Sequence, residues 1–90
     1  MTTEYSNFEY STLEYTVASM KRPHLADLLR RIRVEAHLTQ HQIAKKIGQT
    51  QSYVSKYEHG EQRLDLIELE AVCDAAGVSL SEFVRRYLES

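Results

Sequence analysis

From Pro23 onward, apolar residues recur with the period of an α-helix. The first apolar stripe has the spacing i, i+3, i+4, i+7, i+11, which predicts an amphipathic helix over about residues 23–36. Its members are Leu25, Leu28, Leu29, Ile32 and Ala36. Pro23 favours the first turn of this helix, because the N–H that proline lacks would be unpaired there in any case.

Capping residues and glycines divide the rest of the chain into four more short helices. Three pairs of residues have the spacing of a capping box, in which each partner side chain bonds the backbone N–H of the other; they are Thr39 with Gln42, Asp65 with Glu68, and Ser79 with Glu82. Thr50 suits a further cap, and Gly48, Gly60 and Gly77 can end helices because glycine adopts a positive φ at little cost. The predicted helices cover about residues 40–47, 51–58, 66–76 and 80–89.

Apolar positions on these helices predict a shared core. The residues expected to face inward are Ile43, Ala44, Ile47, Val54, Tyr57, Leu66, Leu69, Cys73 and Ala76. The last helix also carries apolar residues, namely Phe83, Val84, Tyr87 and Leu88, of which some are expected to pack into the core. Five short helices with tight connections predict an all-α bundle over residues 21–90.

Residues 1–20 have a different composition and form an acidic, Tyr-rich arm. A Glu-Tyr pair recurs every five residues, beginning at Glu4, Glu9 and Glu14, a period that fits neither helix nor strand. The alternation over residues 13–17 allows a short strand. Two interpretations stay open: a mobile arm, or an ordered arm that contacts a second copy in a dimer or covers apolar surface.

Composition is that of a single folded domain. The chain has 90 residues, of which 42% are hydrophobic and 27% charged, which favours a globular domain over a disordered one. No stretch approaches the roughly 18 apolar residues of a membrane-spanning helix, and no signal-peptide pattern opens the chain. Cys73 is the only cysteine, so no intrachain disulfide forms and a reducing, cytoplasmic compartment is expected.

Charge is distributed unevenly along the chain, although the net charge is only −2. Residues 1–20 carry −3, residues 21–63 carry +5 and residues 64–90 carry −4. A basic centre between acidic flanks is typical of a nucleic-acid site. Charge alone does not distinguish such a site from an ordinary solvated surface.

Residues 40–59 predict two short helices joined by a turn at residues 48–50. A small residue, Ala44, lies where the helices cross closely, and Gly48 suits the turn. Four apolar residues would fix the angle between the helices: Ile43, Ile47, Val54 and Tyr57. This leaves a polar face on the second helix, formed by Gln51, Ser52, Ser55 and Lys56, with Tyr53 at its edge.

This segment resembles the Cro/C1-type (XRE-like) helix-turn-helix family of phage repressors and bacterial regulators. The resemblance is carried by Arg33 and by the runs Leu38–Gly48 and Tyr53–Gly60, and it covers about residues 24–88. It implies a compact five-helix bundle of the lambda-repressor-like DNA-binding type. It also implies a bacterial or phage-encoded protein that acts on the nucleoid. The family usually has glycine where this chain has His37, a residue type that tolerates positive φ better than most.

The resemblance also implies roles for individual residues. Gln40 would meet a phosphate and brace the recognition helix, Gln51 and Ser52 would face base edges, and Lys56 would reach a base or a phosphate. Glutamine can pair bidentately with adenine, lysine can donate to guanine, and helix N-termini offer N–H groups to phosphates. Arg33 and Glu58 resemble the family's ion pair, and Arg63 lies in a loop that would grip the DNA backbone. The predicted DNA-binding set is Gln40, Thr50, Gln51, Ser52, Tyr53, Ser55, Lys56 and Arg63.

The sequence therefore predicts a transcriptional regulator, with repression favoured. It would bind a palindromic operator in double-stranded DNA as a homodimer, with helix 51–58 in the major groove. The last helix carries more apolar surface than one bundle needs, so part of it, with the arm, would form the dimer interface. One alternative is a protein-binding adaptor or antitoxin-like module that holds a protein partner through the arm. Another is an arm that mimics DNA and folds over the basic face.

Other chemistry finds little support in the sequence. His37 and His41 have a metal-like spacing, but a helix break separates them and no third ligand is near. A buried Cys73 would act as a small hydrophobe. Neither a Gly-rich phosphate loop, nor paired carboxylates, nor a nucleophile with its base is visible. We expect no catalytic residues, no cofactor and no metal.

Overall fold

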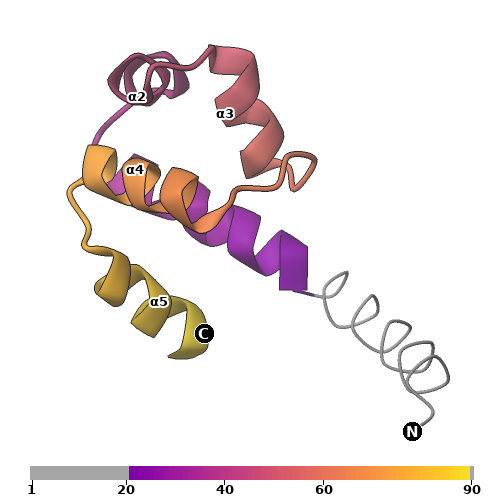
Figure 1. The fold of residues 1–90 in the computed structure, drawn as a ribbon, viewed down its shortest axis with the longest axis vertical. Helices are drawn as coiled ribbons and strands as arrows, with labels where there is room; N and C mark the ends of the chain where they lie inside the picture. The colour runs from indigo at the N-terminus through magenta and orange to yellow at the C-terminus, as the bar shows by residue number, and fades with distance from the viewer. Residues whose placement is uncertain (1–20, 90) are drawn as a thin grey trace, which may run out of the picture.

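The computed structural model describes residues 21–89, which form five helices and no strand. A helix over residues 21–35, called here the 21–35 helix, is followed by α2 (Gln40–Ile47), α3 (Gln51–Glu58), α4 (Leu66–Ala76) and α5 (Leu80–Glu89). In Figure 1, α4 crosses the 21–35 helix, with α2 and α3 on one side of the crossing and α5 on the other. The all-α prediction is confirmed. The predicted arm and its short strand lie outside the described residues.

All five helices contribute to one apolar core. Ile32, Ile43, Val54, Val72 and Phe83, one from each helix in turn, are each no more than 2% exposed. Full burial of an apolar side chain of this size contributes about 1.5–3 kcal/mol. None of the helices within residues 21–89 has the length and apolar character of a transmembrane span.

The predicted caps form at the starts of α2, α3 and α4. The Thr39 hydroxyl accepts from the N–H of Gln42 at 3.1 Å, and the Gln42 side-chain oxygen accepts from the N–H of Thr39 at 2.8 Å. Asp65 and Glu68 form the same reciprocal box at the start of α4. The Thr50 hydroxyl accepts from the N–H of Tyr53 at 3.1 Å.

The capping box predicted at α5 forms only in part. The Ser79 hydroxyl accepts from the N–H of Glu82 at 3.1 Å. The Glu82 carboxylate, however, accepts from the Arg85 guanidinium, with a distance of 3.0 Å from Arg85 Nε. A charge-assisted bond to a neighbour one turn away outcompetes a bond to a neutral backbone N–H.

The inward face of α4 differs from the prediction at two positions. Leu66, expected in the core, is 66% exposed, and its neighbour Ile67 is 78% exposed. Val72, which the sequence analysis did not include, is buried. The stripe that packs on the core begins at Leu69, one turn later, because the first turn of α4 extends past the edge of the core.

The helix ends agree closely with the predicted glycine positions. Gly48 and Gly77 have φ of 69° and 77°, in the left-handed region. His37 has φ of 60° and is the non-glycine residue in this region among residues 21–89. The 21–35 helix is already formed at Lys21, so Pro23 lies within it, and it ends one residue earlier than predicted.

We expect His37→Gly to stabilise the protein. The left-handed conformation raises the free energy of a residue with a Cβ atom by about 1–2 kcal/mol, and glycine avoids most of this cost. The free energy of unfolding should rise by about 1 kcal/mol and Tm by about 4–8 °C, measured by circular dichroism. His41→Gly is the matched control, because His41 is also exposed but lies inside α2, where glycine should lower Tm. An unchanged or lower Tm for His37→Gly would contradict the account of this turn.

Candidate nucleic-acid interface

Helix α3 is held by its apolar face. Val54 and Tyr57 are buried in the core, and Ala44 of α2 is buried where the two helices meet. On the other side of α3, Ser52 and Lys56 are exposed, while Gln51 and Ser55 are half-buried. The helix therefore presents polar side chains to solvent from a rigidly packed base.

An ion pair joins the end of α3 to the 21–35 helix. Arg33 donates from Nε to Glu58 Oε2 at 2.6 Å and from Nη2 to Glu58 Oε1 at 3.0 Å. Its third nitrogen, Nη1, donates to the carbonyl oxygen of Leu38 at 2.9 Å. The side chains of Arg33 and Glu58 are 13% and 2% exposed, and the bond to Glu58 raises the pKa of Arg33. The predicted ion pair is confirmed.

Two glutamines extend this network to the start of α3. Gln40 Nε2 donates to Glu58 Oε1 at 3.0 Å, and Gln51 Nε2 donates to Gln40 Oε1 at 2.6 Å. Gln40 thus links the two ends of α3, bonding Glu58 at its last position and Gln51 at its first. An amide nitrogen carries two N–H groups, so Gln51 keeps one N–H and its oxygen for another partner. The bond between the glutamines was not predicted, because no local signal links the first residues of consecutive helices.

Three further predicted residues have structural roles of their own. Thr50 is exposed and caps α3. Ser55 lies beside His59, whose Nδ1 is 2.7 Å from the Ser55 carbonyl oxygen. Tyr53 packs against the core, edge-on to Tyr57 with ring centroids 5.8 Å apart. Burial, with the nearby Glu68 and Asp65 carboxylates, raises the pKa of Tyr53.

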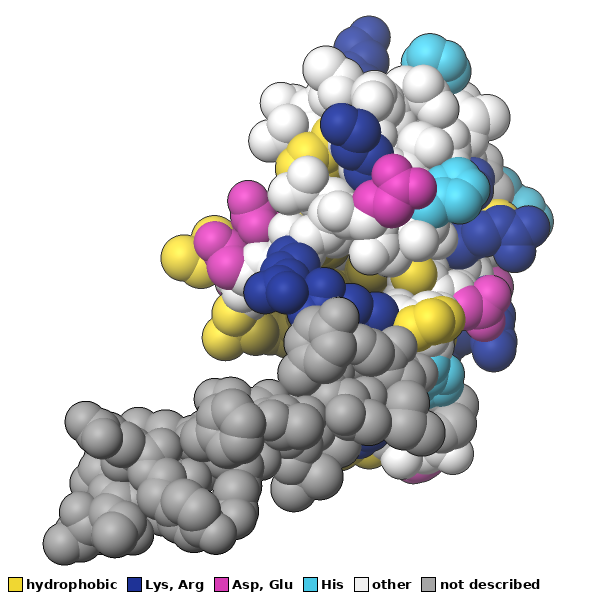
Figure 2. All heavy atoms as spheres, turned by 90° about the vertical axis from the view of Figure 1, so that its right-hand side faces the viewer, with side chains coloured by type: hydrophobic (Ala, Val, Ile, Leu, Met, Phe, Trp, Pro, Cys, Tyr) yellow, Lys and Arg dark blue, Asp and Glu magenta, His cyan; other side chains and the backbone are white. Residues whose placement is uncertain are grey.

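Basic side chains are spread over the face shown in Figure 2. Arg63 is exposed in the loop that follows α3, and Lys56 is exposed on α3 itself. Within residues 21–63 the net charge is +5. Glu58, one of the four acids there, is buried and paired with Arg33, and this pair is neutral as a whole. This part of the surface therefore favours an anionic partner.

The described residues offer no alternative site for a metal or a reactive thiol. Within residues 21–89, no group of three His, Cys, Asp or Glu side chains could hold a metal ion. Cys73 is fully buried, and burial raises the pKa of its thiol to about 11. A protonated, buried thiol is a poor nucleophile near neutral pH.

Comparison with known proteins places this geometry in a family. Residues 29–83 match a family model described as helix-turn-helix. No curated protein sequence matches the chain. An XRE-family like protein from Pseudomonas syringae pv. tomato is 32% identical, with a TM-score of 0.78, and the match covers 86% of this chain and 94% of that one.

A gene regulator and a controller protein share the fold at lower identity. The clp gene regulator ClgR from Corynebacterium glutamicum is 26% identical with a TM-score of 0.71, over 78% of this chain and 90% of that one. The restriction-modification controller protein C.Esp1396I, solved as a tetramer with its natural 35-base-pair operator, is 23% identical. Its TM-score is 0.71 over 77% of this chain and 91% of that chain, a likeness of fold alone.

Glu58→Ala should destabilise the fold by about 3 kcal/mol, because it leaves the Arg33 charge without its partner. Urea denaturation measures this loss. Replacing both residues, with Arg33→Met and Glu58→Leu, should recover most of it, since no unpaired charge then remains. Glu35→Ala is the control. It breaks an exposed ion pair in which Arg86 Nη1 and Nη2 donate to the two Glu35 carboxylate oxygens at 2.8 and 2.9 Å. The midpoint of urea denaturation should therefore change little. Equal losses for Glu58→Ala and Glu35→Ala would refute the role given to the network.

Proposed function

The chain belongs to the Cro/C1-type helix-turn-helix family of DNA-binding regulators, and we propose that it represses transcription as a homodimer on a palindromic operator. The observation that carries the proposal is α3, which has one face locked in the core and the opposite polar face exposed. We assign DNA contact to Gln40, Thr50, Gln51, Ser52, Tyr53, Ser55, Lys56 and Arg63. As in other DNA-binding regulators, the site of action would be the nucleoid, in the bacterial cytoplasm.

Base reading is assigned to the first turns of α3, because recognition helices dock with their N-terminal residues at the bases. The free N–H and oxygen of the Gln51 amide match the two groups that adenine presents in the major groove. Its bond to Gln40 orients this amide before DNA arrives, which lowers the cost of ordering it on binding. Lys56, one turn later, would reach a guanine or a phosphate.

Backbone binding is assigned to the helix starts and to the loop after α3. The caps of α2 and α3 use the N–H groups of Gln42 and Tyr53, so earlier N–H groups in each first turn can donate to phosphates. Gln40 lies at the first position of α2, and Arg63 adds a positive charge. Such contacts set the register of the protein on the duplex without reading its sequence.

A homodimer is proposed because one recognition helix reads too few base pairs. Two half-sites about 34 Å apart require a twofold arrangement. On α5, Val84 and Leu88 are 40% and 72% exposed, whereas Phe83, which the sequence analysis grouped with them, is buried. Exposed apolar groups of this kind mark candidate interfaces. C.Esp1396I, which shares the fold, is a tetramer on its operator.

Gln51→Ala with Lys56→Ala should weaken binding to a duplex selected from random sequences by about 100-fold, because each base contact contributes about 1–3 kcal/mol. Fluorescence anisotropy at one fixed salt concentration measures the affinity. Lys46→Ala is the charge-matched control, because Lys46 lies beside Ala71, Asp74 and Ala75 of α4, and it should change the affinity little. Parent-like affinity in the double variant, with its fold intact, would exclude α3 as the recognition helix.

Val84→Glu with Leu88→Glu should convert the dimer to a monomer, because each substitution places a charge in the proposed apolar interface. Sedimentation at micromolar concentration measures the oligomeric state. Val34→Glu is the control: Val34 is equally apolar and exposed, but lies on the 21–35 helix, and its replacement should leave the dimer intact. A parent chain that sediments as a monomer both with and without DNA would overturn the dimer.

A further inference from the structure

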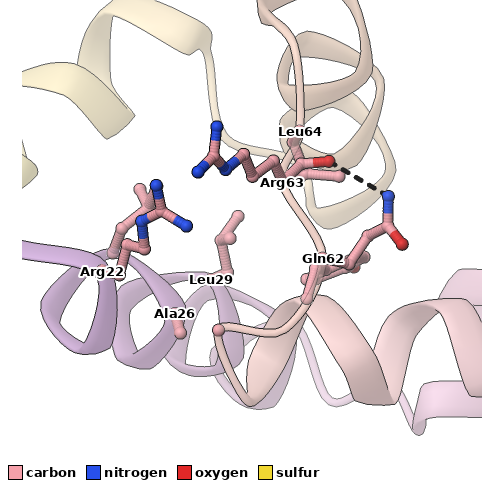
Figure 3. A pocket seen from close by; sticks show the side chains of 9 residues that line it. Arg22, Ala26, Leu29, Gln62, Arg63 and Leu64 are labelled. Carbon is pink, nitrogen blue, oxygen red and sulfur yellow. Dashed lines mark hydrogen bonds between the residues drawn. The ribbon is translucent and has the colours of Figure 1, made fainter. Parts of the chain in front are cut away.

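A cavity of about 200 Å³ lies between the 21–35 helix and the loop that connects α3 to α4. Figure 3 shows it from close by. Its lining residues are Arg22, Leu25, Ala26, Leu29, Tyr57, Gly60, Gln62, Arg63 and Leu64. The volume is smaller than the roughly 300–1,000 Å³ of typical small-molecule sites, so it suits side chains of a protein segment better than a ligand of that class.

The cavity combines an apolar floor with two positive charges. Three leucines and an alanine supply apolar lining, and Arg22 of the 21–35 helix and Arg63 of the loop after α3 line the cavity from its two walls (Figure 3). No acidic side chain lines the cavity, and within residues 21–89 neither arginine forms an ion pair. A guanidinium without a counter-ion favours a carboxylate, which accepts from it in a forked geometry.

Tyr57, which also lines the cavity, carries a polar group without a hydrogen-bond partner among the described residues. Tyr57 is 1% exposed, and its hydroxyl forms no hydrogen bond with any described residue. Buried hydroxyl groups in folded proteins nearly always have a partner. Burial also raises the pKa of Tyr57, so the hydroxyl keeps its proton as a donor. The cavity is thus lined by two arginines that form no ion pair with a described residue and by a tyrosine whose buried hydroxyl has no partner among them.

The complementary chemistry is present in the chain itself. Residues 1–20 carry Glu4, Glu9 and Glu14, each followed directly by tyrosine, and they contain no Lys or Arg. A Glu-Tyr pair offers a carboxylate for the arginines and a ring with an apolar body and a polar tip. The nearest pair, Glu14 with Tyr15, precedes Lys21 by a linker of residues 16–20. Reversing the chain takes about four residues, so this linker is long enough to return the pair to Arg22.

We propose that this cavity binds a Glu-Tyr pair from residues 1–20 of the same chain, with the carboxylate between Arg22 and Arg63 and the ring over the apolar floor. One consequence rests on the proposed function, in which Arg63 contacts the DNA backbone. The bound arm withdraws Arg63 from DNA, so that arm and operator compete. Occupancy of the cavity does not itself depend on DNA binding.

Occupancy is tested in the full chain without DNA by attaching a nitroxide at Ser11→Cys. Cys73 is fully buried, so the label is directed to the new cysteine. The proposal predicts that NMR signals of Gly60, Arg63 and Leu64, all far from the label in sequence, lose at least half of their intensity. Adding Arg22→Gln, or E4Q/E9Q/E14Q, should restore the signals. Unaffected signals in the labelled parent, or broadening that survives both sets of substitutions, would overturn the proposal.

A mixed sample distinguishes the two sources of the arm. Spin-labelled chains without ¹⁵N are combined with ¹⁵N-labelled chains that carry no nitroxide. If Gly60, Arg63 and Leu64 are broadened when each chain carries both the nitroxide and ¹⁵N, but not in the mixture, the cavity is occupied by the arm of the same chain. Broadening of comparable size in the mixture, where the nitroxide and the ¹⁵N are on different chains, assigns the cavity to the arm of a second copy and overturns the proposal as stated.

Competition is tested by affinity for the selected duplex. The E4Q/E9Q/E14Q variant should bind severalfold more tightly than the parent. The control variant E70Q/D74N/E89Q removes the same net charge from exposed positions on α4 and α5 and should show a much smaller gain. Equal gains in DNA affinity in the two variants would show that the gain comes from net charge alone, and would refute competition between the arm and the operator. A parent without DNA affinity would refute the proposed function, while the nitroxide result would still decide the occupancy of the cavity.

Discussion

The carboxylate of Glu58 is the point on which the geometry of the interface depends. It is almost completely withdrawn from water, so its charge requires partners inside the protein. Arg33 supplies two charge-assisted bonds and Gln40 supplies a third, which joins the 21–35 helix, α2 and α3 through one group. Gln40 in turn holds Gln51. The outward presentation of α3 therefore follows from a buried charge at its C-terminal end as much as from apolar packing.

Most of the fold could be predicted because its boundaries are set by local interactions. A cap or a positive φ acts within three or four residues, so Thr39 and Gly48 were sufficient to bound α2. Burial depends on neighbours that are distant in sequence. Leu66 fits the helical stripe and is nevertheless exposed, while Val72 was missed and is buried. At α5, Glu82 bonds Arg85 in place of the backbone, a competition that a capping pattern does not register.

The interface could be predicted only in outline. The pairing of Arg33 with Glu58, 25 residues apart, was expected from the family resemblance and not from any local pattern. The cavity flanked by Arg22 and Arg63 was not predicted, because its two walls come from the 21–35 helix and from the loop after α3. Residue types identify groups that can bind phosphates and bases, but only the packed fold determines which of them share a surface. The bases that Gln51 would read depend on the duplex as well.

The central claim is that the polar face of α3 enters the major groove of the operator. The most direct measurement is an NMR titration of the ¹⁵N-labelled full chain with a duplex selected from random sequences. The account predicts the largest shifts at the backbone and side-chain amides of Gln51, with neighbouring changes at Ser52 and Lys56. Shifts concentrated on α4 or α5, with α3 unchanged at saturation, would contradict it.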